Sequence, residues 1–300
     1  MRKIFFLSLC FFSFLLFQPV AKAAPSPAPT MLRVSPIILP IRLAPGSIQK
    51  TNIRLTNLLS VPLPVAATIE GFDAADEEGA VEIHSPQAHV SPLVDWMSLD
   101  QSDQILPAGA SRDIAVTITV PKSVPLGGYY AVIFFTPKLP TGNISAKIGV
   151  IALANIGVGL DPTHHVDIVS FGFGKSVYEK GPVDLTLRVH NTSLNYFSVK
   201  PTLTIAPLFG NTQTIQLEEK TILPGKIRRW HRSLNLGPLT HGLYWVSLRL
   251  SLENGQEVVA KTSFIGFPVT KTIVFFLGSL ALGWILLNRR RTMAAIKAFF

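Results

Sequence analysis

Apolar and polar residues alternate with a period of two over much of this chain, and that periodicity restricts the fold to β-sheets. The segment 183–190 has its apolar residues at every second position: Val183, Leu185, Leu187 and Val189. The segments 113–120 and 244–252 follow the same pattern. Because successive side chains of a strand point to opposite faces of its sheet, each segment is predicted to be a strand with one face on a core and the other in solvent.

The predicted strands are short and lie between turn-forming residues. The 300-residue chain has 23 prolines and 21 glycines, and no long amphipathic helix interrupts the strand patterns. The segments 129–135 and 148–156 are apolar at both odd and even positions, as expected of central strands. Many short strands between proline and glycine turns are typical of antiparallel sandwiches, so an all-β fold is predicted.

The strand-forming region is duplicated. An alternating strand ends in Asn57 in the first copy and in Asn191 in the second, and Leu106-Pro107 is matched by Leu223-Pro224. Asparagine tolerates the turn conformation that must follow each strand. The duplication predicts two tandem immunoglobulin-like β-sandwich domains.

The two copies differ in length. The first contains an additional polar stretch, 73–92, which we interpret as an inserted loop. The strand-like sequence breaks near Leu160-Asp161-Pro162. We therefore predict a first domain at 31–160 and a second at 161–267.

The N-terminus has the three parts of a secretory signal peptide. Two basic residues precede the apolar run 4–17, and the small residues Ala21 and Ala23 form a cleavage site. An apolar run of this length is too short to span a membrane comfortably. Residues 1–23 are therefore predicted to be removed during export.

An apolar run near the C-terminus ends abruptly in positive charge. The run 273–287 is uncharged and is followed by Asn288 and three arginines: Arg289, Arg290 and Arg291. A helix over 272–288 would be about 25 Å long, close to the thickness of a hydrocarbon core. The positive-inside rule places the basic tail 289–300 in the cytoplasm, so we predict a single-pass membrane protein with its N-terminal domains outside.

The net charge of +9 comes mostly from the two ends of the chain. Seven of the 27 lysines and arginines lie in the signal peptide and the tail, where there is no acid, so the remaining 20 face 18 acidic residues. The exported part is nearly neutral, and no nucleic-acid partner is expected. The single cysteine, Cys10, lies in the signal peptide, which excludes disulfides and cysteine metal ligands from the mature chain.

The order of short motifs resembles that of a known group of exported proteins. Val34-Ser35-Pro36 is followed by Trp96, Val120-Pro121-Lys122 and Gly127-Gly128-Tyr129. This order is similar to that of the bacterial WxL-interacting proteins, and the strand and turn motifs also resemble pilus-chaperone-like immunoglobulin domains. The resemblance implies two immunoglobulin-like domains before a C-terminal anchor, and it implies binding to peptidoglycan or to surface proteins.

The densest basic and aromatic cluster is the candidate ligand-binding site. Its members are Arg228, Arg229, Trp230 and Arg232. Guanidinium groups bind carboxylates and phosphates through paired hydrogen bonds, and an indole can stack on a sugar face, so an anionic wall polymer would suit this surface. The alternative is a solvated strand without a ligand, in which Trp230 covers the edge of the core. The sequence pattern is compatible with both interpretations.

Other polar groups carry weaker signals for chemistry. The carboxylates of 73–82 could bind calcium, but their spacing lacks the regularity of an ion-binding loop, and a solvated loop is expected. His164, His165 and Asp167 have no further ligand pattern near them. No Gly-x-Ser-x-Gly elbow, His-Glu-x-x-His motif or phosphate-binding glycine loop is present. We predict a protein that is not an enzyme and has no metal or cofactor.

These observations predict a non-enzymatic cell-surface binding protein that contacts a cell-wall polymer or surface and secreted proteins, with membrane lipid around its helix. The alternative is an anchored assembly chaperone that accepts a partner strand by β-addition. The anchor disfavours that alternative, because a chaperone that shuttles subunits should diffuse. Ser279 and Gly283 have the small-xxx-small spacing of helix contacts, which suggests a weak homodimer.

Overall fold

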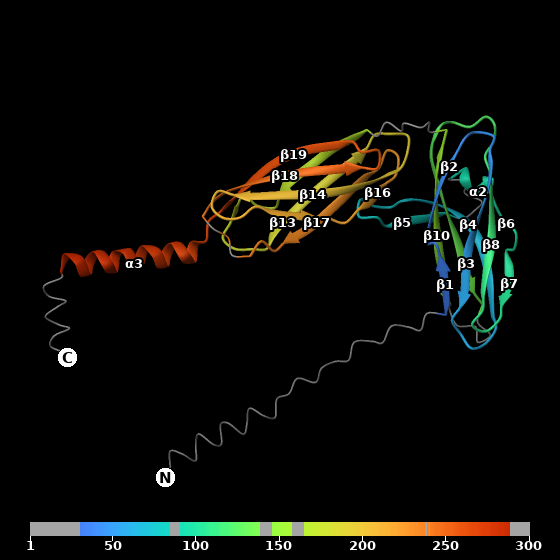
Figure 1. Ribbon diagram of the computed structural model, residues 1–300, viewed down its shortest axis with the longest axis horizontal. Helices are drawn as coiled ribbons and strands as arrows, with labels where there is room; N and C mark the ends of the chain where they lie inside the picture. Colours follow the sequence, from blue (N-terminus) through green and yellow to red (C-terminus); the bar gives the residue numbers. More distant parts are fainter. Residues whose placement is uncertain are drawn as a thin grey trace, which may run out of the picture.

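The computed structural model describes residues 31–84, 91–138, 146–157, 165–237, 239 and 241–288. Two β-sandwiches and one long helix follow each other in a row, with the helix at the far end from the first sandwich (Figure 1). The predicted signal peptide with Ala21 and Ala23, and the tail with its three arginines, lie outside the described residues. The predicted boundary at 160 also lies outside them and stays a prediction.

The first sandwich has two sheets, in the orders β1-β3-β8-β6 and β2-β10-β9-β4-β5, with β7 also paired to β4. Its elements are β1 (Leu32–Ser35), β2 (Ile38–Leu43), β3 (Ile48–Asn57), β4 (Leu63–Ala74), β5 (Val81–His84), α2 (Leu93–Trp96), β6 (Met97–Leu99), β7 (Asp103–Leu106), β8 (Ser111–Thr119), β9 (Gly127–Pro137) and β10 (Ile148–Ile156). The alternate apolar residues of β3 and β8, such as Ile53 and Val116, are fully buried between the sheets.

The second sandwich repeats this arrangement with sheets β11-β13-β17 and β12-β19-β18-β14-β15, and β16 pairs with β14. Its strands are β11 (Val166–Phe173), β12 (Val177–Tyr178), β13 (Val183–Asn191), β14 (Phe197–Pro207), β15 (Gln213–Gln216), β16 (Lys220–Ile222), β17 (Ile227–Leu234), β18 (Gly242–Leu252) and β19 (Glu257–Gly266). Both sandwiches have the strand order of immunoglobulin domains. The predicted fold class is confirmed.

The asparagines that end the repeated strands hold each sandwich at the same point. The side chain of Asn57 donates hydrogen bonds to the carbonyls of Val61, Leu106 and Pro107, and its oxygen accepts the N–H of Leu59. Both asparagines are buried.

Asn191 makes the matching bonds in the second sandwich, to the carbonyls of Asn195 and Ile222 and from the N–H of Ser193. The duplication read from the sequence is thus repeated in hydrogen bonds, and both asparagines satisfy buried backbone groups rather than only tolerating a turn.

The two sandwiches differ at one sheet edge. In the first, β6 pairs with β8 and covers it. In the described part of the second, no strand takes the place of β6, so β17 lies at the edge of its sheet. An edge strand presents unpaired backbone groups, which must find other partners.

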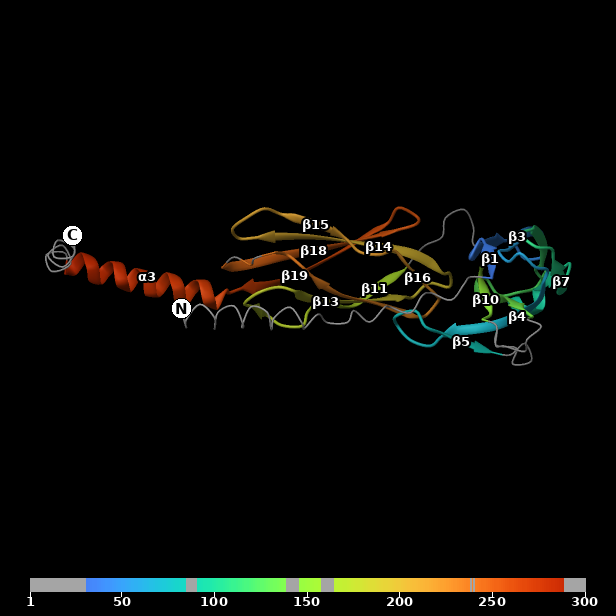
Figure 2. The same cartoon turned by 90° about the horizontal axis from the view of Figure 1, so that it is seen from below.

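The interpretation of 73–92 as an inserted polar loop is wrong for 73–74 and 81–84, which are strand residues, and 85–90 lie outside the described residues. β4 continues to Ala74 and pairs with β5, in a ladder that runs from Gly71 opposite His84 to Ala74 opposite Val81. The ladder can form because Phe72 is buried on one side of the strand and anchors it. The segment is therefore a hairpin that projects from the first sandwich (Figure 2).

The C-terminal helix α3 (Val269–Leu287) has 19 residues and buries none of them. It is long and apolar enough to cross a membrane. It starts three residues before the predicted span, directly after Pro268, and Asn288 caps its end by a backbone bond to Trp284.

Candidate binding site

The two sandwiches meet through a small apolar core. It consists of Phe72, Val132 and Leu153 from the first sandwich and Tyr196 and Leu223 from the second. The Tyr196 hydroxyl donates to the carbonyl of Leu153 at 3.0 Å. The side chain of Asn155 also exchanges two hydrogen bonds with the backbone of Tyr196, at 3.1 and 3.2 Å. Because these polar contacts are buried beside apolar side chains, they set the position of one sandwich on the other.

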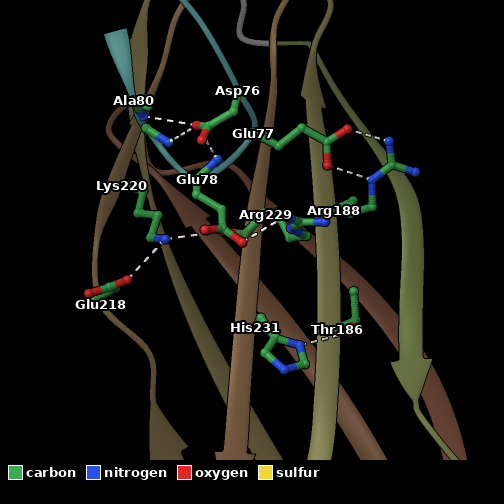
Figure 3. A network of polar contacts seen from close by, with 11 residues as sticks. Asp76, Glu77, Glu78, Ala80, Thr186, Arg188, Glu218, Lys220, Arg229 and His231 are labelled. Carbon is green, nitrogen blue, oxygen red and sulfur yellow. Dashed lines mark hydrogen bonds and ion pairs between the residues drawn. The ribbon is translucent and has the colours of Figure 1, made fainter.

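The tip of the β4–β5 hairpin lies on the edge strand β17 of the second sandwich (Figure 1, Figure 2). The backbone N–H of Arg229 donates to the carbonyl of Glu77 at 2.7 Å. The Glu77 carboxylate accepts two hydrogen bonds from Arg188, one of them from Nε at 2.8 Å (Figure 3). Glu78 accepts a bond from Arg229 at 2.7 Å. The hairpin of one domain therefore covers part of the open edge of the other.

Asp76 shapes the tip that makes these contacts. One of its carboxylate oxygens accepts the backbone N–H groups of Glu78, Gly79 and Ala80, each within 2.9 Å (Figure 3). These bonds, led by the one from Ala80, lower the pKa of Asp76. Gly79 has a backbone φ of +115°, which residues with a side chain rarely adopt. An added Cβ would also lie 2.7 Å from the Arg228 guanidinium. The turn thus needs a glycine to approach β17.

Contacts across the domains lower the pKa of two hairpin carboxylates, Glu77 and Asp73. The bond from Arg188 is the main cause that lowers the pKa of Glu77. Burial raises the pKa of Asp73, but its bonds to Lys226 and to the Ala74 N–H outweigh that effect, and the pKa is lowered. Among the described residues, no three His, Cys, Asp or Glu side chains are placed so that they could hold one metal ion together. The hairpin carboxylates instead bind basic side chains and backbone N–H groups.

The four residues of the predicted ligand-binding cluster have different surroundings. Trp230 is buried in the second core and donates its indole N–H to the carbonyl of Glu218 at 2.8 Å. Arg229 is paired with Glu78. Arg232 is exposed on β17. Arg228 is half-buried and donates from Nε to the carbonyl of Thr221 at 3.0 Å. Trp230 thus packs in the core, as in the alternative interpretation of the sequence. The four residues do not form one continuous surface.

A cleft of about 460 Å³ lies between the domains beside the hairpin. Its floor is apolar and comes from both sandwiches: Ile38, Phe72, Ile151, Leu153 and Leu223. Its rim is charged: Glu78, Glu218, Glu219, Lys220 and Arg228. An apolar floor with a few polar groups at its rim is the usual form of a binding site.

Arg228 is the most unusual group of the cleft. Burial lowers its pKa, and the more distant charge of Asp76 compensates only in part. No carboxylate among the described residues is in ion-pair contact with it. A guanidinium that is partly desolvated and lacks such a partner would gain energy from an anionic group that entered the cleft.

Sequence reasoning missed Arg188, Glu77 and the role of the hairpin. The available signal was the near-equal number of acids in 73–82 and of basic residues in 226–232, two oppositely charged clusters in a nearly neutral exported region. Their sequence separation concealed that they neutralise each other.

No family model matches the sequence, and no curated protein matches it. Solved structures with a similar fold include the class 5 fimbriae chaperone CfaA, at 16% identity and a TM-score of 0.41, with 77% of this chain and 98% of that chain covered. The CupB2 chaperone of Pseudomonas aeruginosa has 8% identity and a TM-score of 0.40, covering 76% and 98%.

A third similar structure is the CsuC–CsuE chaperone–tip adhesion subunit complex from Csu pili of Acinetobacter baumannii. It has 10% identity and a TM-score of 0.44, with 77% of this chain and 98% of that chain covered. At this level the similarity concerns the fold alone. The resemblance to WxL-interacting proteins stays a prediction.

Proposed function

We propose that this chain is a non-enzymatic, membrane-anchored binding protein that holds a protein partner in the cleft between its two domains. The observation that carries the proposal is the half-buried Arg228 at the rim of an apolar cleft that both domains form. The apolar floor suits side chains of a partner, and Arg228 suits a carboxylate.

A protein partner fits this cleft better than an anionic wall polymer does. Glu78 and Glu218 are paired with Arg229 and Lys220, and Glu219 lies on the rim beside Arg228, so the rim has no excess of positive charge for a polyanion. Arg188 and Arg229 are already paired with the hairpin glutamates. The wall polymer expected from the sequence would therefore find few uncompensated charges here.

The proposal places the two domains outside the membrane. Helix α3 would cross it, and the three arginines after Asn288 would lie in the cytoplasm. The cleft would then face the exported side, within reach of surface and secreted proteins.

The alternative, strand addition, has one supporting observation. Beyond Arg229, the edge of β17 at His231–Leu234 has no neighbouring strand in the described part of the chain. A partner strand could pair there. Such a partner would block the edge and would be released only on denaturation.

The test is photo-cross-linking of the full-length protein in its native cells. A photoreactive residue at Glu219, on the cleft rim, is expected to give a protein adduct. The matched control is Val259, exposed on the outer face of β19. Equal adducts at the two positions, or a polysaccharide adduct at Glu219, would rule out the protein-binding cleft. A photoreactive residue at His231 tests the alternative: an adduct found only there would favour strand addition.

Arg228→Ala provides a second measurement. Loss of a charge-assisted hydrogen bond costs about 1.5–3 kcal/mol, so the adduct at Glu219 should fall by roughly tenfold or more. Arg232→Ala removes the same charge four residues further along β17, at a side chain that does not line the cleft, and should leave the yield unchanged.

A further inference from the structure

The end of the second sandwich next to α3 carries a group of exposed apolar side chains. The strand pairings place the end of β14, the start of β18 and the end of β19 together, with Pro207 opposite Tyr244 and Gly242 opposite Gly266. Figure 1 shows this end turned toward α3. Leu208, Phe209 and Phe267 at this end are 49%, 64% and 44% exposed.

The backbone holds these side chains outward. The N–H of Leu208 donates to the carbonyl of Leu243, and the N–H of Phe267 donates to that of Tyr178, each at 2.8 Å. Val177 and Ile265, which are opposite each other in the β12–β19 pair, extend the same apolar surface. Several large apolar groups on one end of a domain mark a contact surface.

The connection to α3 brings this end close to the membrane. Pro268 alone separates Phe267 from the first residue of α3. The rings of His241 and Phe267 pack edge to face, with centroids 5.5 Å apart, and the His241 Nε2 lies 2.6 Å from the Thr272 hydroxyl. His241, the residue directly before β18, is thus bound to the first turn of the helix.

The length of α3 sets the depth at which this end lies. Nineteen residues rise about 28 Å, so nearly the whole helix is needed to cross a hydrocarbon core of about 30 Å. Phe267 and Pro268 must then lie at the level of the lipid headgroups. Aromatic side chains prefer this layer.

The polar groups of this end also suit a phospholipid surface. Lys175, Lys180 and Lys271 are exposed here, and Glu179 is an exposed acid beside them. A hollow of about 540 Å³ between the domain and the helix is lined by His241, Lys271, Thr272 and Phe275. Lys271 can extend its ammonium group toward the headgroups, and Phe275 is further along the helix toward the acyl chains.

We propose that this end of the second sandwich rests in the outer headgroup layer, with Leu208, Phe209 and Phe267 inserted among phospholipids. The inference rests on the proposed anchoring by α3. It makes the second domain a base that holds the first domain and the cleft away from the membrane, because the two sandwiches and the helix lie in a row (Figure 2).

The test places one nitroxide label at a time on the full-length protein in phospholipid nanodiscs, with Cys10 removed or changed to serine. Collision rates with oxygen, which concentrates in lipid, and with a water-soluble nickel complex report depth. Phe209→Cys is expected to give an oxygen-to-nickel ratio several-fold above that of Val259→Cys, a position 54% exposed at the other end of the same sheet.

A third label separates this inference from the anchoring. Leu280→Cys lies in the middle of α3. If position 280 reports lipid while 209 matches 259, the base does not touch the membrane and this inference alone is wrong. If 280 also reports water, the anchoring and this inference both fail. Because position 209 is exposed, its label disturbs no core packing, and Phe267→Cys repeats the measurement independently.

Discussion

Glu77 in the first domain binds Arg188 in the second through both carboxylate oxygens, joining residues 111 positions apart. The contact lies at the tip of a hairpin that also pairs by its backbone with Arg229. Part of the basic surface that the sequence suggests for an external ligand is thus used inside the molecule, and the cleft beside it retains Arg228.

Glu77→Gln should loosen the hairpin without unfolding either sandwich. The amide cannot form the ion pair, and only weaker hydrogen bonds remain. We expect several-fold faster hydrogen exchange at the Arg229 amide, which donates to the Glu77 carbonyl. Glu82→Gln, on the exposed part of β5, is the matched control. Equal exchange in the two variants would show that the ion pair does not hold the tip.

Acid should have the same effect as that substitution. The pKa of Glu77 in the folded protein is lowered from its ordinary value of 4.5, chiefly by the bond from Arg188. Its stabilising contribution is therefore complete above pH 4.5 and is lost as the pH falls through the lower folded pKa. Exchange at Arg229, corrected for the intrinsic rate, should rise in that range in the natural sequence, and the rise should be smaller in Glu77→Gln.

Gly128→Ala should weaken the docking of the two domains. An added Cβ would lie 2.8 Å from Pro224 Cγ and 3.1 Å from the Tyr196 nitrogen, and Gly128 also donates its N–H to the Leu194 carbonyl. Overpacking costs about 1–3 kcal/mol. We therefore expect a protease to cleave the variant between its domains faster than it cleaves the natural protein. Gly172→Ala on β11 meets no atom within 4 Å and should be cleaved at the natural rate.

Asn191→Ala should destabilise the second sandwich by about 3 kcal/mol, because two buried carbonyls and one N–H lose their partner. Urea unfolding followed by far-ultraviolet circular dichroism measures the change. Asn52→Ala, on the exposed face of β3, should stay within about 0.5 kcal/mol of the natural protein. A similar small effect at Asn191 would contradict its role in satisfying the turn.

Trp230→Phe should lower the stability of the second domain more than it affects binding in the cleft. The ring is 1% exposed, and its N–H bond to Glu218 would be lost at a cost of about 1–2 kcal/mol. Urea unfolding gives the stability, and the adduct yield at Glu219 gives the binding. Lost binding with unchanged stability would restore Trp230 as a ligand-contacting residue.

The strands were accessible to prediction because their evidence is local. In β18 the even positions Tyr244 to Leu252 are buried, as their alternation predicts. The hairpin at 73–84 could not be predicted in this way, because its polar composition is that of a solvated loop. Its pairing depends on burying Phe72 against the second domain. For the candidate site, the sequence places the four residues of the cluster on one short segment, but it does not show which of them are covered.

The alternating strands, their duplication, the asparagine at the end of one repeated strand and the apolar helix can be read from the sequence, because each depends on residues near one another in the chain. The pairing of Glu77 with Arg188, the burial of Trp230 in a core and the place of Arg228 beside a cleft become visible only in the folded molecule. Ion pairing and desolvation depend on distance in space, and that distance is set by how two separately built domains dock.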